Sequence, residues 1–259
     1  MVNSRVLQKL RSGEVVRTAG VSRVMEPWLT EVIGFLGYDQ IWMDLEHRTF
    51  GEDVIAPLSL ACRATGIDLM ARIRKSGYDS PMRALEFGAN GIMVPHIKSA
   101  AEARDWVNWC RFPPLGKRGL DGAGADSRYA LDPVLPYLEH ANKETFLVLQ
   151  IEDREAVECA DEIAAVPGVD VLFIGPGDLS LSYGVPMQFQ HPDLLRARDV
   201  VANAVAKHGI WWGTTTANAA LAQEAVDHGC RMITCGGDHG ALLQGFRHSL
   251  EEFSSVKVR

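Results

Sequence analysis

The segment FLVLQIEDREAVECADEIAAVPGVDVLFIGPGDLS (Phe146–Ser180) contains two short apolar runs separated by one helical pattern. The runs Phe146–Glu152 and Val169–Pro176 are nearly continuous in Val, Leu, Ile and Phe, which is typical of strands buried on both faces. The segment between them, Arg154–Val166, is expected to be a helix. A strand, a helix and a strand in this order predict a right-handed βαβ unit in a parallel sheet.

The same alternation of apolar runs and helical patterns extends through the whole chain. Eight such units within 259 residues favour a closed (β/α)8 TIM barrel over an open doubly wound sheet, because this barrel takes about 250 residues. No GxGxxG motif follows the first run and no linker interrupts the chain, so a single domain spanning residues 1–259 is expected. The predicted strands are Val15–Val21, Gln40–Glu46, Asp68–Arg74, Gly91–Ile97, Phe146–Glu152, Val169–Pro176, Gly209–Thr215 and Cys230–Gly236.

Composition narrows the class of protein. The net charge is −7 and no Lys/Arg run occurs, which argues against nucleic acid or an anionic membrane as a partner. No apolar stretch approaches the ~18 residues of a membrane span, and the N-terminal sequence does not resemble a signal peptide. Five cysteines without a CxxC pair indicate reduced thiols and a cytoplasmic location. Cys230 and Cys235 flank the last predicted strand, and we favour buried thiols over a metal-ligand pair.

Polar residues close most of the predicted strands, and in this barrel the chemistry lies at the carboxyl ends of the strands. One long glycine-containing stretch, Arg111–Pro133, is expected to be a functional loop, and Gly240–Phe253 is expected to be a final helix. The polar residues at the strand ends are Asp44, Glu46, His47, Arg72, Arg74, His96, Lys98, Gln150, Glu152, Asp153, Asp178, Asp238 and His239.

Glu152 and Asp178 form the most informative pair. They follow adjacent predicted strands, so their carboxylates are expected to lie within a few ångströms of each other. Two carboxylates that close repel unless a proton or a cation lies between them. Oxygen ligands with room for water suit Mg²⁺ or Mn²⁺, whereas zinc usually takes His or Cys. The alternative is structural: Asp178 caps the following helix, and Glu152 pairs with Arg72.

Two further strand-end side chains carry chemistry at this rim. Arg72 needs an acidic partner or an anionic ligand if it faces the barrel, and an ion pair with Glu46 or Glu152 is the structural alternative. His47 suits acid/base work near neutral pH, with Asp44 as the carboxylate that orients it; a hydrogen-bonded structural histidine is the alternative. Structural roles are also expected for His96, Asp238 and His239.

Several longer pieces carry a resemblance: WMDLEH, MARIR, EFGANGIMVPHIKSAAEA, FPPLGKRG, LQIEDREAVECADEIAAVPGVDVLFIGPGDLS and ITCGGDHGALLQG. They resemble the HpcH/HpaI aldolase family of metal-dependent class II pyruvate aldolases, which includes 4-hydroxy-2-oxoheptanedioate and 2-dehydro-3-deoxyglucarate aldolases. The resemblance extends from Gly13 to Phe253. It implies a (β/α)8 barrel and a carbon–carbon lyase that makes and cleaves 4-hydroxy-2-oxoacids from pyruvate, or a related 2-oxoacid, and an aldehyde through a metal-stabilised enolate.

The resemblance also implies roles for individual residues. Glu152 and Asp178 would be the ligands of Mg²⁺ or Mn²⁺, with Co²⁺ as an alternative and no organic cofactor. His47, backed by Asp44, would move the proton of the aldol hydroxyl, and Arg72 would contact the oxygen of pyruvate or its enolate.

Further residues follow from the same resemblance. Gln150 and the backbone at Gly177 would line the pyruvate site together with Arg72 and Asp178. The resemblance implies a homohexamer built as a trimer of dimers, often with the last helix exchanged between subunits. Glu86 departs from the family, whose members often have Asp there, so the aldehyde is not assigned.

Three rival functions remain open. A Schiff-base aldolase would use Lys75 or Lys98 near the strand ends. An acyl-CoA lyase of the citrate-lyase type would need a basic nucleotide-binding patch, which the sequence does not contain. A non-catalytic 2-oxoacid-binding protein would use the same barrel without turnover.

Overall fold

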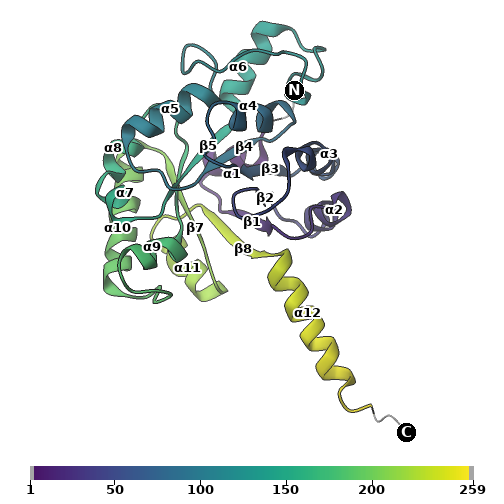
Figure 1. Ribbon diagram of the computed structural model, residues 1–259. Helices are drawn as coiled ribbons and strands as arrows, with labels where there is room; N and C mark the ends of the chain where they lie inside the picture. The colour runs from purple at the N-terminus through teal and green to yellow at the C-terminus, as the bar shows by residue number, and fades with distance from the viewer. Residues whose placement is uncertain (1–2, 257–259) are drawn as a thin grey trace.

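The structure is a computed structural model that describes residues 3–256. Eight parallel strands pair in chain order and close into one barrel, with helices around its outside (Figure 1). All eight predicted strands are confirmed, with boundaries that differ by a few residues. The strands are β1 (Val16–Val21), β2 (Gln40–Asp44), β3 (Asp68–Arg72), β4 (Gly91–Val94), β5 (Phe146–Ile151), β6 (Val171–Ile174), β7 (Trp211–Thr215) and β8 (Met232–Gly237).

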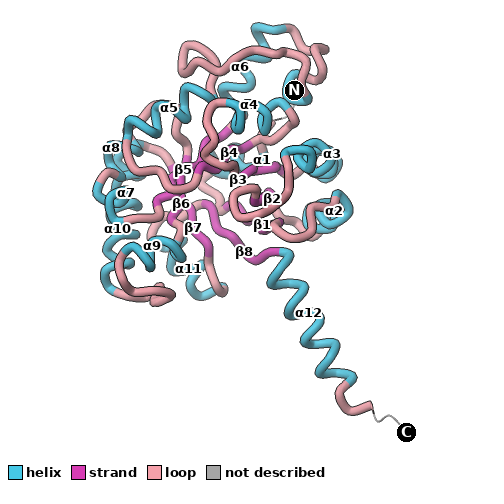
Figure 2. The backbone as a smooth tube through the Cα atoms, viewed as in Figure 1, coloured by secondary structure: helices cyan, strands magenta, loops and turns pink. Residues whose placement is uncertain are grey.

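Helices follow the strands as the alternating pattern predicts (Figure 2). The helix predicted at Arg154–Val166 is two short helices, α7 and α8, which meet at Cys159. The helices are α1 (Arg5–Arg11), α2 (Pro27–Phe35), α3 (Ile55–Thr65), α4 (Asp79–Glu86), α5 (Ala100–Cys110), α6 (Val134–Glu144), α7 (Arg154–Glu158), α8 (Ala160–Ala164), α9 (Pro176–Ser182), α10 (Pro192–His208), α11 (Ala219–Asp227) and α12 (Asp238–Phe253), with 3₁₀ turns at Glu52–Val54 and Ala125–Ser127.

The apolar core has two layers, one on each side of the sheet. The larger layer packs the outer faces of the strands against the surrounding helices. The smaller layer fills the barrel, and α1 closes it from the amino ends of the strands. Burial on both faces explains why the strands are continuous apolar runs in the sequence. The inner layer consists of Val6, Leu7, Leu10, Val16, Met70, Met93, Phe146, Val148, Val171, Phe173 and Met232.

The final helix, α12, begins at the buried Asp238 and projects away from the barrel (Figure 1). Several of its large apolar side chains are exposed, including Phe246 and Leu250 at 73% and 75%. None of the helices within residues 3–256 combines the length and apolar character needed to cross a bilayer.

The start of the loop Arg111–Pro133 is anchored to the barrel, and the cysteines differ in burial. Arg111, at the start of the loop Arg111–Pro133, donates to the carbonyls of Thr145 and Gly168 and pairs with Asp170, so it secures the amino ends of β5 and β6. All five cysteines are free. Cys230 is buried as predicted, whereas the prediction for Cys235 is wrong, because its side chain lies exposed on β8.

Candidate active site

Glu152 lies directly beyond the end of β5 and is the most deeply buried acid at the strand ends, with 3% of its surface exposed. Its Oε1 accepts a hydrogen bond from Nε2 of Gln150 at 3.0 Å. Its Oε2 accepts one from the backbone N–H of His96 at 2.9 Å. Nδ1 of the His96 ring lies 3.2 Å from the same oxygen. The carboxylate is therefore held in one orientation by neighbours on β5 and beyond β4.

The surroundings of Glu152 are electrostatically unbalanced. Burial raises the pKa of the Glu152 carboxyl, the N–H and ring of His96 oppose that rise, and the charges of Asp178 and Glu46 add to it. Within the part of the chain that the structure describes, no lysine or arginine forms an ion pair with Glu152. Oε1 of Gln150 is also buried and has no hydrogen-bond partner. A site of this kind fits a cation better than it fits an empty carboxylate cluster.

Asp178 completes the cluster from the first turn of α9, after β6. One ligand atom from each of His96, Glu152 and Asp178 lies within 4.8 Å of the others. The predicted approach of Glu152 and Asp178 is thus present, and Glu152 does not pair with Arg72 as in the structural alternative. His96, interpreted as structural from the sequence, joins the two carboxylates. Two carboxylates and an imidazole form a donor set that fits a divalent cation.

Gly175 is a site residue that sequence reasoning did not single out. A Cβ atom at this position would lie 2.4 Å from Oε1 of Glu152 and 2.7 Å from its Cγ, which is too close for the carboxylate to stay in place. A Cβ at Gly177 would meet nothing within 4 Å. Gly177 therefore borders open space, while Gly175 makes room for the carboxylate of Glu152.

Arg72 pairs with Asp44 at the end of β2 and with Glu46 just beyond it, instead of with Glu152. Its Nε and Nη2 contact the two carboxylate oxygens of Asp44 at 2.9 Å each, and its Nη1 lies 3.1 Å from Oε2 of Glu46. Its guanidinium carbon sits 4.9 Å from the centre of the Trp42 ring. Burial raises the pKa of Asp44, but the hydrogen bonds and charge of Arg72 outweigh it and hold that pKa below its ordinary value. Arg72 is therefore a fixed positive group facing the rim.

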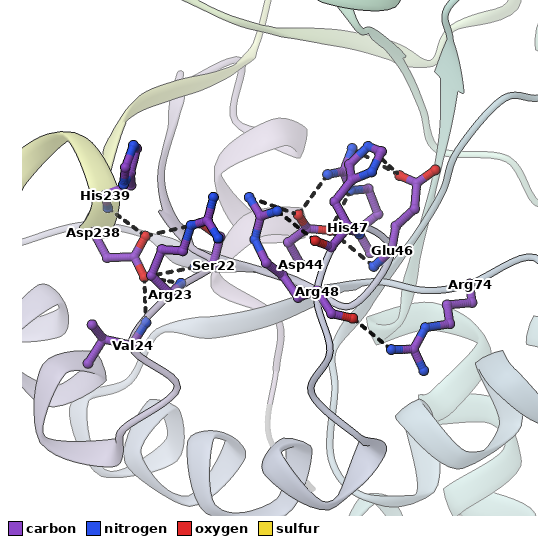
Figure 3. Close-up of polar contacts among 11 residues, drawn as sticks. Ser22, Arg23, Val24, Asp44, Glu46, His47, Arg48, Arg74, Asp238 and His239 are labelled. Carbon is purple, nitrogen blue, oxygen red and sulfur yellow. Dashed lines mark hydrogen bonds and ion pairs between the residues drawn. The ribbon is translucent and has the colours of Figure 1, made fainter.

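The His47 ring is positioned differently from the sequence expectation. Its side chain is 53% exposed, and its Nε2 lies 3.6 Å from Oε2 of Glu46. Asp44 accepts a hydrogen bond from the backbone N–H of His47 at 3.4 Å (Figure 3). Its carboxylate is also paired with the guanidinium of Arg72. The expected orientation of the imidazole by Asp44 is replaced by an Asp44–Arg72 pair, and Glu46 is the carboxylate beside the ring.

The other strand-end residues have partners of their own. Nζ of Lys75 donates to the carbonyl of His96 at 2.8 Å and pairs with Glu102. Lys98, 58% exposed, lies 3.6 Å from Asp153. Asp238 accepts from the backbone N–H groups of Ser22, Arg23, Val24 and His239, so it holds the loop after β1 (Figure 3), in agreement with the structural role expected for it.

Comparison with known proteins gives a consistent result. The sequence profile described as HpcH/HpaI aldolase/citrate lyase matches residues 22–244. The chain is 30% identical to the 4-hydroxy-4-methyl-2-oxoglutarate aldolase tasA of Hapsidospora irregularis, over 96% of this chain and 94% of that protein. It is 31% identical to a hydroxypyruvate/pyruvate aldolase of Pseudomonas aeruginosa, over 96% and 92%. The crystal structure of an HpcH/HpaI aldolase from Desulfitobacterium hafniense DCB-2 superposes with a TM-score of 0.91 at 30% identity, covering 97% of each chain.

Proposed function

This chain belongs to the HpcH/HpaI aldolase/citrate lyase family, and from that premise we propose that it joins and cleaves a 4-hydroxy-2-oxoacid, with pyruvate or a related 2-oxoacid as one partner and an aldehyde as the other. It is an aldolase, a carbon–carbon lyase. The names of two relatives, a hydroxypyruvate/pyruvate aldolase and a 4-hydroxy-4-methyl-2-oxoglutarate aldolase, support 2-oxoacids as the substrate class.

The observation that carries the proposal is the buried, unbalanced cluster at Glu152. The carboxylate oxygens of Glu152 and Asp178 would hold a divalent cation, Mg²⁺ or Mn²⁺, with Co²⁺ as the alternative. When bound, the cation supplies Lewis-acid stabilisation of the negative charge that develops on the 2-oxoacid as its C3 proton is lost. Gln150 fixes the orientation of Glu152 through its side-chain amide.

Arg72 and His47 supply the remaining chemistry. The guanidinium of Arg72 is held by Asp44 and Glu46, and this fixed positive charge would stabilise the oxygen of the 2-oxoacid that gains charge. The ring of His47 is exposed at the rim. In the addition direction it would donate a proton to the alkoxide oxygen formed from the aldehyde, and in cleavage it would take the proton from the hydroxyl. The backbone at Gly177 borders the space in which the 2-oxoacid would lie.

A chelator and a reductant distinguish this function from the Schiff-base rival. We expect EDTA to abolish turnover and added Mn²⁺ or Mg²⁺ to restore it, with no covalent adduct after borohydride and pyruvate. The contacts of Lys75 and Lys98 support this expectation, because both lysines are ion-paired and partly exposed. A pyruvate adduct on either lysine, found by mass spectrometry, together with activity in EDTA, would overturn the proposal.

A second assay addresses the remaining rivals. A 2-oxoacid-binding protein without turnover would not exchange the methyl protons of pyruvate with D₂O, whereas the proposed enzyme should do so without any aldehyde, as followed by NMR. An acyl-CoA lyase would cleave a CoA thioester substrate, and we expect no such cleavage.

We also propose that one barrel domain per chain assembles into a homohexamer, a trimer of dimers, in the cytoplasm. The projecting α12, with Phe246 and Leu250 exposed, supports exchange of this helix between subunits. Light scattering coupled to size-exclusion chromatography measures the assembly directly.

A further inference from the structure

His96 stands out among the strand-end residues for its backbone. Its φ of 50° lies in the left-handed region, which non-glycine residues rarely adopt and which often marks functional sites. Two hydrogen bonds hold the backbone there: its N–H donates to Glu152 at 2.9 Å, and its carbonyl accepts from Lys75 at 2.8 Å. The result of this strained turn is an imidazole placed against the carboxylate of Glu152.

We propose that the imidazole of His96 is a third protein ligand of the cation held by Glu152 and Asp178, and that it makes the centre prefer Co²⁺ to Mg²⁺. This inference rests on the proposed metal-dependent function and adds the metal preference to it.

The distances within the cluster fit three ligands on one ion. Nδ1 of His96 lies 3.2 Å from Oε2 of Glu152, and one ligand atom from each of the three side chains lies within 4.8 Å of the others. Donor atoms about 2.1 Å from a common ion are about 3.0–4.2 Å apart, so small side-chain adjustments bring the set onto one cation. The side chain of His96 is 43% exposed, so the cluster is not closed off from solvent on the histidine side.

The second ring nitrogen of His96 lies on the side of a carboxylate, that of Glu46. Nε2 of His96 lies 3.6 Å from Oε1 of Glu46. The other carboxylate oxygen of Glu46, Oε2, lies 3.1 Å from Nη1 of Arg72. Metal-binding histidines usually direct their other N–H at a carboxylate, which fixes the tautomer and strengthens the donor nitrogen. A proton on Nε2, facing Glu46, leaves the lone pair of Nδ1 directed at the cluster.

The metal preference follows from the donor set. Mg²⁺ binds oxygen almost exclusively, whereas affinity for a site containing nitrogen rises from Mn²⁺ to Co²⁺. An imidazole at His96 therefore strengthens Co²⁺ binding and adds little for Mg²⁺. The competing interpretation is that His96 is a positive partner of Glu152, in which case no nitrogen would reach the ion.

Two substitutions test the ligand without disturbing the turn. His96→Asn and His96→Gly both tolerate the left-handed backbone; the first offers an oxygen donor and the second offers none. The control is His239→Asn, at an exposed histidine in the first turn of α12. Metal-free protein is titrated with Co²⁺ and with Mg²⁺ by calorimetry, and pulsed EPR of the Mn²⁺-loaded protein detects coordinated ¹⁴N.

We expect the ratio of Co²⁺ to Mg²⁺ affinity to fall by about tenfold or more in both His96 variants, with the ¹⁴N coupling lost, while His239→Asn retains both. If wild type and variants share one affinity ratio and none shows ¹⁴N coupling, while EDTA still abolishes turnover, the ligand role of His96 is wrong and the metal-dependent function stands. If wild type binds neither ion and stays active in EDTA, both proposals are wrong.

Discussion

Two buried acids at opposite ends of the barrel, Asp39 and Glu152, have opposite surroundings. At the amino ends of the strands, Asp39 is fully buried but accepts hydrogen bonds from Arg5 at 3.0 Å and Lys9 at 2.9 Å. At the carboxyl ends, Glu152 is as well shielded from water, yet its neighbours are a half-exposed histidine and two further acids. Lysine and arginine side chains neutralise Asp39, whereas no lysine or arginine of the described residues pairs with Glu152.

The pKa directions express the same contrast. Burial raises the pKa of Asp39, but the backbone N–H of Arg17 and the contacts of Lys9 and Arg5 outweigh it, so the carboxyl stays ionised. Burial raises the pKa of Glu152, and Asp178 strengthens the rise. The contrast indicates that Asp39 serves folding, whereas the acids around Glu152 form the cluster that the proposed cation would complete.

Removing the acid at the open end should have the largest effect on activity. Glu152→Ala is expected to lower kcat/KM by about a thousandfold or more, because the cation loses its buried ligand. Stability should not fall, since a buried and unbalanced charge disappears. Turnover at saturating Mn²⁺ and urea unfolding measure the two quantities. Full activity in a Glu152→Ala, Asp178→Ala double variant would contradict the proposed site.

Removing Asp39, at the amino ends of the strands, should lower stability and leave activity unchanged. Asp39→Ala is expected to lower the free energy of unfolding by about 4 kcal/mol, because it strands the charges of Arg5 and Lys9. The folded fraction should keep its kcat/KM, because the residues at the carboxyl ends of the strands are unchanged. Urea unfolding and an assay at matched folded concentration test this, and equal stability of variant and wild type would remove the contrast.

Asp68, also at the closed end, should make stability depend on pH. It accepts from Ser4 Oγ at 2.6 Å and from Val6 N–H at 2.9 Å, and burial raises its pKa to about 6. A raised pKa means that the folded state binds the proton more tightly, so its stabilisation is full below about pH 4 and is lost as pH rises through about 6.

Asp68→Asn isolates this contribution, because titrations elsewhere cancel in the difference. The free energy of unfolding of wild type minus that of Asp68→Asn should fall by about 2 kcal/mol from pH 4 to pH 7. Urea unfolding of both proteins in EDTA at several pH values provides the measurement. A difference that stays flat, or rises with pH, would show that Asp68 is not protonated in the fold.

Replacing His47 should have a smaller effect on activity and stability than replacing the buried acids, because its ring is exposed. His47→Ala is expected to lower kcat by about a hundredfold while pyruvate still binds and stability stays within about 0.5 kcal/mol. Pyruvate titration by calorimetry separates binding from turnover. Unchanged kcat would assign the proton transfer to another group at the open end.

The smallest effects compare two glycines in one turn. Gly175→Ala should cost about 2 kcal/mol of stability and weaken metal binding, because its Cβ displaces Glu152. Gly177→Ala, in the first turn of α9 with open space around it, should be neutral or stabilising by up to about 1 kcal/mol. Thermal unfolding of the two variants side by side provides the test, and equal losses would show that the turn itself, and not Glu152, is sensitive.

The parts of the structure that were predictable follow from simple periodicity. Continuous apolar runs such as Phe146–Glu152 mark strands buried on both faces, and eight of them in this length specify the barrel. Glu152 and Asp178 could be paired from sequence because adjacent parallel strands end at the same rim.

What escaped prediction depends on register and on tertiary contacts. Asp44 stands directly opposite Arg72 in the β2–β3 ladder, so the arginine takes the carboxylate that the sequence suggested for His47. The left-handed turn at His96 is imposed by contacts with Glu152 and Lys75, which are distant in sequence. The sequence Gly-Pro-Gly at positions 175–177 does not indicate that Gly175 and Gly177 have different surroundings.

The closure of the barrel by α1 has a practical consequence. Val6, Leu7 and Leu10 seal one end while the strand tips open at the other, so a tether attached ahead of α1 would leave the open end facing the bulk solution. Immobilisation on a resin or an electrode through that tether should therefore preserve access of reagents to the open end. A linker that displaced α1 would instead destabilise the barrel.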